Sequence, residues 1–461
     1  MRKLALLCLA GSLAGCVNLA PAHVRPEMPT ANEYPAEFAH DEVPGQRAAE
    51  IGWRDFFVDA RLEGLVGQAL VHNRDLAVAV AQIDEARGLY RIQRADRLPS
   101  ITANADATRG RAMGEDNPET GNTLSTGISI TSFELDFWGR VKNLSEATRR
   151  EYLATQEAER AFRLALIRDV ASTYFTSREA EERITLAQAT MESRHDALRI
   201  AQRRLDAGVT SALDYRQAES LLTQAETDLA GLKLAKAQSD NFLAVLTGGP
   251  ATTPLPPSTP LSQQMAMPTL AVGLPSDLLV ARPDIVAAEE RLRAARANIG
   301  AARAAFFPSI SLTGNAGFAS TELGSLFESD GFTWSFGPAI RLPIFDGGRN
   351  KANLTVAEAR ENMAVARYEF AIQNAFREVA DALAGRKYYA EQVASQERGV
   401  EATRRIARLA QLRYREGVAS YIEVLDAERN SFTAEQTLVQ LRRAQAENLV
   451  SLYVALGGGL I

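Results

Sequence analysis

The stretch EGVASYIEVLDAERN, residues 416–430, is the key to the architecture, because the chain uses nearly the same phrase, AGVTSALDYRQAES, at residues 207–220. In each copy an acid follows the glycine of a Gly-Val pair by six residues. The copies are 209 residues apart, and the same offset relates further pairs: Pro99-Ser100-Ile101 with Pro308-Ser309-Ile310, Gly139-Arg140 with Gly348-Arg349, and Gly248-Gly249 with Gly457-Gly458. One unbroken offset over so many positions indicates a duplicated structural unit.

Length and composition limit what the repeat can build. The chain has 461 residues, of which 46% are hydrophobic and 23% charged, as in folded proteins. The formal charge of −6 and the lack of a strong basic patch argue against a nucleic-acid partner. The four histidines have no metal-ligand spacing, and no G-x-S-x-G, P-loop or H-E-x-x-H motif is present. We therefore expect no enzyme, no catalytic or metal-binding residue, and no cofactor other than a covalent lipid.

The N-terminus has the pattern of an export signal. Arg2-Lys3 precedes an apolar stretch that begins at Leu4 and ends in Leu13-Ala14-Gly15-Cys16. This order is typical of a signal peptide, and Leu-Ala-Gly-Cys resembles the bacterial lipobox, in which cleavage occurs before a lipidated cysteine. We expect removal of residues 1–15 and a lipid anchor on Cys16; a chance cysteine in an ordinary signal peptide is the alternative. Because residue 17 is Val and not the Asp that retains many lipoproteins at the inner membrane, we expect outer-membrane localisation.

The offset and the composition divide the chain into segments. After the signal peptide we expect a lipidated N-terminal arm at 16–61, a first repeat at 62–250, a linker at 251–270 and a second repeat at 271–461. The linker is expected because TGGPATTPLPPSTPLSQQMAMP, residues 247–268, is rich in proline, which fits neither a helix interior nor a central strand.

Each repeat contains a long segment with few helix breakers. No Gly or Pro occurs from Lys142 through Ala207, and no Pro occurs from Asn350 through Glu416. At 1.5 Å per residue such a helix extends for about 100 Å, which no globular core can cover. We expect long helices at about 140–247 and 349–456. In the last helix the 3,4 spacing of a left-handed supercoil is followed by Val424, Ala427, Ser431, Ala434, Leu438, Leu441, Gln445, Asn448 and Leu452. This seam predicts either a close helix contact or a wetted face.

Two shorter segments, at about 99–137 and 308–345, alternate in polarity as β-hairpins do. In the last strand every second position is apolar, at Phe332, Trp334, Phe336, Pro338, Ile340, Leu342 and Ile344. A small antiparallel sheet packed on helices is one interpretation. Export and the long helices favour another, in which the strands form an outer-membrane barrel with an apolar outside and a polar lumen. Four strands cannot close a barrel of at least eight, so several chains would share one.

The chain resembles the TolC-like outer-membrane efflux proteins, and in particular their lipoprotein, NodT-like branch. The lipobox and four phrases carry the resemblance: GWRDFF (52–57), GLPSDLLVARPDI (273–285), RLPIFDGGR (341–349) and ALGGG (455–459). It implies a mainly α-helical homotrimer with a 12-strand outer-membrane β-barrel, four strands per chain, continuous with a periplasmic coiled-coil tunnel. It also implies an exit duct for drugs or other toxic small molecules, with a periplasmic adaptor and an inner-membrane transporter as partners.

The repeated segments at 207–220 and 416–430 predict the tips of two helical hairpins. In each copy the glycine would end a long helix, so we expect turns at Gly208-Val209 and Gly417-Val418. The pairs Ser211 with Asp214 and Ser420 with Glu423 fit the capping box, which satisfies free N–H groups at a helix start.

One acid has no capping role. Asp426 lies one turn after Glu423 on the same helix face, and the first copy has Gln217 there, so the duplicated fold does not require an acid. In the family that the chain resembles, acids at the second-repeat tip narrow the periplasmic mouth. The resemblance therefore implies a gate at Glu423 and Asp426, with Asp214 from the first repeat, and adaptor docking at the two Gly-Val turns. Capping and gating can both hold for Glu423.

A rival function is a lipid-anchored periplasmic helical scaffold without a pore. It accounts for the helices and the lipobox, but not for the alternation from Phe332 to Ile344. The sequence does not specify the cargo, because a passive duct binds its cargo weakly. It also leaves open which adaptor and pump are the partners and what holds the gate closed.

Overall fold

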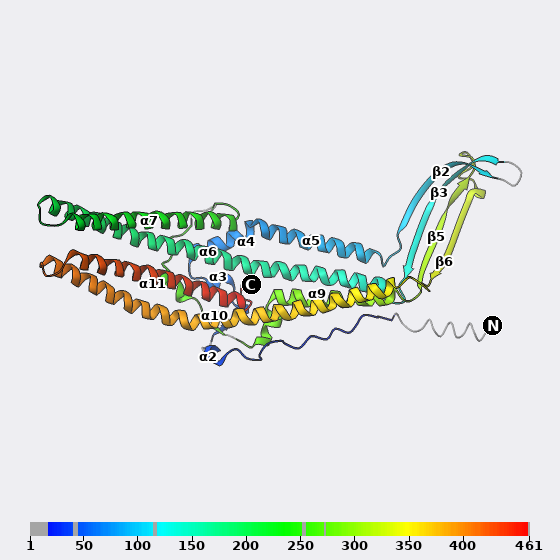
Figure 1. Ribbon diagram of the computed structural model, residues 1–461. Coiled ribbons are helices and arrows are strands. Elements are labelled where there is room, and N and C mark those ends of the chain that lie inside the picture. Colours follow the sequence, from blue (N-terminus) through cyan, green and yellow to red (C-terminus); the bar gives the residue numbers. More distant parts are fainter. Residues whose placement is uncertain (1–16, 40–44, 114–117, 251–254, 272, 460–461) are drawn as a thin grey trace. The chain divides into compact units, whose positions relative to one another are not determined.

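The computed structural model describes residues 17–39, 45–113, 118–250, 255–271 and 273–459 (Figure 1). Cys16 and the predicted signal peptide lie outside these residues. The chain divides into two compact units, and each draws on both repeats. Unit 1 consists of Met1–Glu27, Ala81–Gln156 and Ala287–Phe370; unit 2 consists of Met28–Val80, Glu157–Val286 and Ala371–Ile461.

The two predicted hairpins form one antiparallel sheet in unit 1 (Figure 1). Its strands are β2 (Ile101–Met113), β3 (Pro118–Leu135), β5 (Ser309–Ser320) and β6 (Phe332–Arg341), in the order β2-β3-β5-β6. The hairpins join through β3 and β5, which come from different repeats. Among the described residues β2 and β6 each pair on one side only. The sheet therefore has two open edges.

The strand register sorts the side chains into an apolar and a polar face. One row across the sheet contains Ala103, Ile128, Ala316 and Trp334, and the adjacent row contains Thr102, Ser129, Asn315 and Ser335. Hydrogen bonds link the polar row, since Thr102 Oγ1 lies 2.9 Å from Ser129 Oγ, and Ser335 Oγ donates to Asn315 Oδ1 at 2.8 Å. On the other face Trp334 is 72% exposed. In a single chain, the apolar face of the sheet is therefore exposed.

A β-bulge explains a phase shift in the apolar pattern of β3. The step from Ile130 to Phe133 covers three residues, whereas the paired step on β5, from Gly314 to Leu312, covers two. Ser132, inside the bulge, has a φ of 54°. The extra residue returns Phe133 to the apolar face.

The last strand ends earlier than the alternation predicts. β6 stops at Arg341, whereas the pattern runs on through Leu342 to Ile344. Pro343 has no N–H and cannot donate to a strand ladder. Pro338 inside β6 is tolerated because β6 lies at an edge of the sheet.

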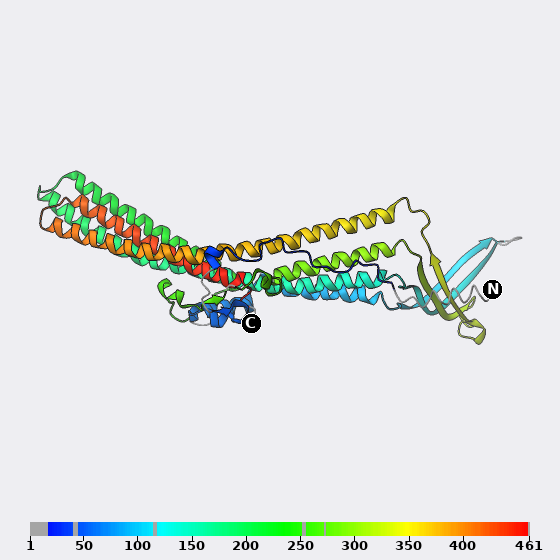
Figure 2. The ribbon, with the colours of Figure 1, turned by 90° about the horizontal axis from the view of Figure 1, so that it is seen from below.

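Each repeat places a helix of 22 residues directly before its hairpin and two longer helices after it (Figure 1, Figure 2). These helices are α5 (Arg74–Ala95), α6 (Arg140–Asp206) and α7 (Ala212–Leu246) in the first repeat, and α9 (Pro283–Ala304), α10 (Arg349–Arg415) and α11 (Tyr421–Ala455) in the second. Both α6 and α10 have 67 residues, and both α7 and α11 have 35. The predicted fold class, mainly helical with a β part and two repeats, is confirmed. No helix in the described ranges has an apolar stretch long enough to cross a membrane.

In unit 2, α7 packs on α6 and α11 packs on α10 (Figure 1, Figure 2). Ser177 Oγ donates to Asp240 Oδ1 at 2.6 Å in the first pair, and Gln396 Nε2 donates to Ala434 O at 2.9 Å in the second. The pairs meet along α6 and α11, where Arg443 binds Glu179. Buried positions of the predicted seam are Val424, Ala427, Ser431, Leu438 and Leu452. At these positions the seam is a close helix contact rather than a wetted face.

Short segments complete both units. They are α2 (Ala36–Ala39), β1 (Gln46–Arg47), α3 (Trp53–Phe56), α4 (Ala60–His72), β4 (Leu270–Ala271), α8 (Leu278–Ala281) and four 3₁₀ segments at Ala48–Glu50, Leu261–Ala266, Pro275–Asp277 and Ser329–Gly331. Asp59, fully buried in unit 2, accepts hydrogen bonds from Tyr174 Oη at 2.6 Å and Gln264 Nε2 at 2.7 Å. Gln264 belongs to the predicted linker. The described part of this linker therefore packs into unit 2, since its prolines exclude an α-helix but allow 3₁₀ turns.

Candidate functional site

Both predicted Gly-Val turns lie in unit 2, at the ends of α6 and α10. Gly208 has a φ of 71° and Gly417 of 74°, a region that glycine adopts without strain. The residue after each glycine donates its N–H to the carbonyl five residues earlier, at 2.9 and 3.0 Å, as in a Schellman helix end. Val209 is 62% and Val418 66% exposed. Each tip thus presents an apolar side chain to the solvent.

The first tip contains the predicted capping box. Asp214 N donates to Ser211 Oγ at 3.2 Å, and Ser211 N donates to Asp214 Oδ2 at 3.3 Å. Thr210 Oγ1 also donates to Asp214 Oδ2, at 2.7 Å. The hydrogen bond from Thr210, followed by those from Ser211, lowers the pKa of Asp214 below its ordinary value. Asp214 is therefore a carboxylate engaged in the cap of α7.

The second tip lacks the capping box, so this prediction is wrong for Ser420 and Glu423. The Ser420 side chain makes no cap hydrogen bond. Glu423 Oε1 instead lies 2.8 Å from Arg413 Nη1, in the last turn of α10. A glutamate is long enough to reach across the turn, whereas the shorter Asp214 of the first copy stays at its own helix start. The helix dipole also favours the negative charge of Glu423 at the start of α11 and the positive charge of Arg413 at the end of α10.

The second predicted gate acid has an arginine partner too. Asp426 Oδ1 lies 2.8 Å from Arg429 Nη2, and both side chains are about three-fifths exposed. The sequence contains a signal for this pair, an acid and a base at i and i+3. It contains no local signal for Arg413, which precedes Glu423 by ten residues. The predicted gate therefore includes both acids but neither of the arginines that pair with them.

Arg204 and Tyr414 join the two tips. The guanidinium carbon of Arg204 lies 5.5 Å from the centroid of the Tyr414 ring, and Arg204 Nη1 donates to Tyr414 Oη. Tyr414 packs in turn against Tyr421, with ring centroids 5.0 Å apart. Arg204 occupies the repeat position of Arg413. Arg204 binds Tyr414, whereas Arg413 binds Glu423. The two arginines differ in partner because the second copy has Tyr414 where the first copy has Leu205.

A small cavity separates the two tips. Its volume is about 270 Å³, and its lining includes Arg204, Asp214, Tyr414, Tyr421 and Ile422. Burial raises the pKa of Tyr421 to about 12, so its phenol remains protonated at neutral pH. Asp214 lines this cavity, whereas Glu423 and Asp426 do not. The three predicted gate acids therefore fall into two groups within one chain.

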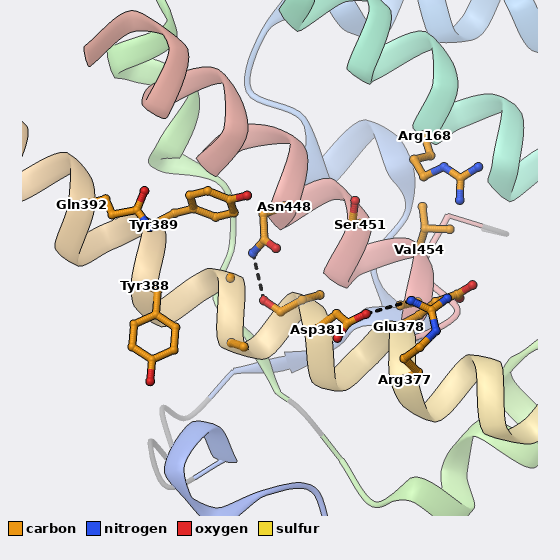
Figure 3. Close-up of a pocket in the computed structure, with 14 residues that line it drawn as sticks. Arg168, Arg377, Glu378, Asp381, Tyr388, Tyr389, Gln392, Asn448, Ser451 and Val454 are labelled. Atoms are coloured by element: carbon orange, nitrogen blue, oxygen red, sulfur yellow. Dashed lines mark hydrogen bonds and ion pairs between the residues drawn. The ribbon is translucent and has the colours of Figure 1, made fainter. Parts of the chain in front are cut away.

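A larger cavity, of about 630 Å³, lies elsewhere in unit 2, between α6, α10 and α11 (Figure 3). Asn448 points from α11 to α10, where its Nδ2 donates to Ala382 O at 2.9 Å. A Cβ on Gly385 would overlap the amide of Asn448, so a larger residue at this position would displace the Asn448 side chain. The lining charges balance, with two arginines and two acids. The cavity contains no predicted site residue, and across the described ranges no group of three or more His, Cys, Asp or Glu could hold a metal ion.

The chain is similar to several characterised proteins. The sequence model described as "Outer membrane efflux protein" matches residues 65–249 and 274–458, so the second match begins and ends 209 residues after the first. The cation efflux system protein CusC of Escherichia coli (strain K12) is 42% identical, over 99% of this chain and 99% of its own. The solvent efflux pump outer membrane protein SrpC of Pseudomonas putida is 42% identical, over 97% and 96%. The crystal structure of the open state of the Neisseria gonorrhoeae MtrE outer membrane channel superposes with a TM-score of 0.87 at 39% identity, over 96% and 98%.

Proposed function

This chain belongs to the outer membrane efflux protein family, and on that premise we propose how it works as the outer-membrane channel of an efflux system. Three copies assemble into a passive exit duct for small toxic molecules, and the chain has no enzymatic activity. The observation that carries this proposal is the sheet of unit 1, which has one apolar face and two open edges.

The open edges support closure with other copies. Four strands per chain cannot close a barrel, and three chains supply twelve strands, above the minimum of eight. Strand β6 of one copy would pair with β2 of the next, so that no unpaired edge remains. The apolar row with Trp334 would face lipid, and the polar row with Ser335 would line the lumen.

We propose a gate at the periplasmic mouth made of Glu423 and Asp426, with Asp214 beside it. Around a threefold axis six acids from the second repeat would face one another and repel. Within each chain, however, Arg413 and Arg429 lie 2.8 Å from these acids. The acids are therefore already compensated within each chain, and a change of the gate would need only to rearrange exposed ion pairs of at most about 1 kcal/mol each. A partner that binds the open state better by a few kcal/mol would shift such a gate.

The two tips are the proposed docking points for a periplasmic adaptor, which in turn contacts an inner-membrane transporter. Val209 and Val418 are exposed apolar residues on these turns. Val209 N donates to Arg204 O at 2.9 Å and Gly417 N donates to Tyr414 O at 3.0 Å, so each turn is bonded to one partner of the Arg204–Tyr414 contact. An adaptor that binds Gly208-Val209 and Gly417-Val418 would therefore bear on the contact that joins the tips.

The proposed anchor is a lipid on Cys16, outside the described residues. Val17, the next residue, donates its N–H to Phe137 O at 3.3 Å, at the end of the sheet from which α6 continues. This contact would keep the lipid near the barrel. Mass spectrometry of the mature chain tests the anchor: an unmodified Cys16 or a retained signal peptide would overturn it.

The choice of cargo is best assigned to the partner proteins, the pump and the adaptor. CusC is named for cation efflux and SrpC for solvent efflux, yet both are 42% identical to this chain. Overall identity to the duct therefore does not separate the two cargoes. We propose that pump and adaptor select the cargo and that this chain conducts more than one class of small molecule.

Conductance in planar lipid bilayers tests the main proposal. The purified full-length protein should be trimeric by light scattering and should insert as a pore with a uniform conductance. A protein that does not conduct even as the Tyr414→Phe variant, in which the contact between the tips is loosened, would instead support a helical scaffold without a pore.

A further inference from the structure

The N-terminal strap, residues 17–25, lies along α9 in unit 1. Arg303 Nη1 of α9 donates to Leu19 O at 3.3 Å. A Cβ on Gly300 would lie only 2.7 Å from Ala20 N, so the strap touches the helix backbone at a glycine. The strap is therefore docked by specific contacts.

A histidine forms the central contact of the strap. His23 Nδ1 lies 2.9 Å from Arg296 Nη1, and His23 Nε2 lies 3.0 Å from Glu289 Oε1. Arginine only donates hydrogen bonds, so Nδ1 must be unprotonated to accept. The proton of the neutral imidazole then resides on Nε2 and is donated to Glu289. This geometry requires an uncharged His23, even though one neighbour is an acid.

We propose that His23 makes the docking of the N-terminal strap on α9 pH-dependent. The neutral imidazole holds the strap on α9, and protonation of His23 loosens it. A proton on Nδ1 would face the N–H of Arg296, so a hydrogen bond would be replaced by a contact between two donors and two positive charges. All of these contacts lie within unit 1 of a single chain.

The charges around His23 do not compensate for the added proton. Glu289 is 5% exposed and is already shared with Arg25 at 2.9 Å and Arg293 at 2.7 Å. Arg296 is also held by Glu361 at 2.8 Å. The charged and titratable groups that face His23 from the packed elements are Arg25 of the strap, Glu289, Glu290, Arg293 and Arg296 of α9, Glu146 and Arg150 of α6, and Glu361 and Tyr368 of α10. Four arginines thus stand beside the four acids before any proton is added.

The pKa of His23 is shifted downward in the docked strap, as pH-dependent docking requires. Burial lowers it most, Arg293 and Arg296 lower it further, and Glu289 opposes them without reversing the shift. A detached strap would restore the ordinary imidazole pKa of about 6.5. The docked state therefore binds fewer protons than the detached state, and docking weakens as the pH falls below about 6.5.

Hydrogen–deuterium exchange of the full-length protein tests the proposal. Labelling is compared at about pH 7.5 and about pH 5.5, on either side of the ordinary imidazole pKa, with times adjusted to equal intrinsic exchange and a peptide of α9 as reference. Protection of the strap peptide should fall by up to about tenfold per pH unit below 6.5. Equal protection at both pH values would overturn the proposal.

Two variants separate His23 from other titrating groups. His23→Gln keeps one acceptor and one donor but cannot take up a proton, so the strap should lose its pH dependence whatever its absolute protection. His195→Gln, on α6 in unit 2, should keep the pH dependence of the parent. A pH dependence that persists in His23→Gln would show that another group is responsible.

Discussion

Glu423 Oε1 lies 2.8 Å from Arg413 Nη1, across the turn that joins α10 to α11. Residue Glu423 is thus neither a simple helix cap nor a bare charge at a pore mouth. Together with the Asp426–Arg429 pair, it makes the tip of the second repeat electrically balanced within one chain. The proposed gate is therefore a set of ion pairs, and its tests must treat acids and arginines together.

We expect the double variant Glu423→Gln with Asp426→Asn to assemble as a trimer but to conduct differently. Each exposed pair contributes at most about 1 kcal/mol, so stability changes little. The unpaired Arg413 and Arg429 would add positive charge at the mouth, which lowers cation preference and weakens block by divalent cations. Single-channel recording with cation titrated from the periplasmic side measures both effects.

The matched control for the gate is Glu401→Gln. Glu401 is an exposed acid on α10 that pairs with Arg405 at 3.4 Å, away from the turn. It should conduct and be blocked like the parent. If the double variant does the same, the gate lies elsewhere in the chain.

The two faces of β6 should respond differently to arginine. Phe336→Arg places a charge on the apolar face, at a cost of about 2–4 kcal/mol per chain at mid-bilayer depth, and three copies should prevent assembly. Ser335→Arg, one residue earlier, faces the polar side and should be tolerated. The fraction of heat-resistant trimer on gels reports assembly. Equal loss in both variants would argue against a lipid-facing Phe336.

Tyr414→Phe should loosen the contact between the tips while keeping the aromatic packing on Tyr421. The change removes the hydroxyl that accepts from Arg204, a hydrogen bond with a charged donor whose exposed position limits it to about 1 kcal/mol. Single channels should open more often without an adaptor. A double-mutant cycle with Arg204→Gln measures the coupling, and purely additive effects would mean that the contact does not hold the tips together.

Asp59→Ala should destabilise unit 2 by about 3 kcal/mol, because Tyr174 and Gln264 would lose their buried charged acceptor. Thermal unfolding followed by circular dichroism measures the change. Glu401→Gln again serves as the surface control, with an unchanged melting temperature.

The same aspartate should contribute to acid sensitivity. Burial would raise the pKa of Asp59, but hydrogen bonds from Tyr174, Gln264 and two backbone amides outweigh it and leave the pKa below its ordinary value. The stabilisation is therefore present above the unfolded pKa of about 3.9 and is lost as the pH falls through the lower folded value. Melting temperatures of the parent should decline in that acidic range, and those of Asp59→Asn should decline less.

Much of the secondary structure could be predicted because its signals are local. Glycine at a helix end, proline in a connection and periods of 3.6 or 2 residues depend on neighbours along the chain. Because the offset between the repeats is constant, a helix or strand predicted in one copy also predicts its counterpart in the other. The prediction of β6 extended too far because the alternation was followed past Pro343, itself a local signal. The capping box at Ser420 failed for another reason, since Glu423 pairs with Arg413, ten residues earlier in the chain.

The amino-acid pattern alone was sufficient for the duplicated order of helices and hairpins, the two tips and the positions of their acids, because these follow from short-range sterics and from polarity that alternates along one segment. Folding in three dimensions settled how those acids are used. The arginine opposite Glu423, the tyrosine that receives Arg204, and the histidine between Arg296 and Glu289 all depend on side chains whose separation in sequence does not predict their distance in space. Hydrogen bonds and close ion pairs need their atoms within a few ångströms of each other, so such pairings exist only once the helices have packed.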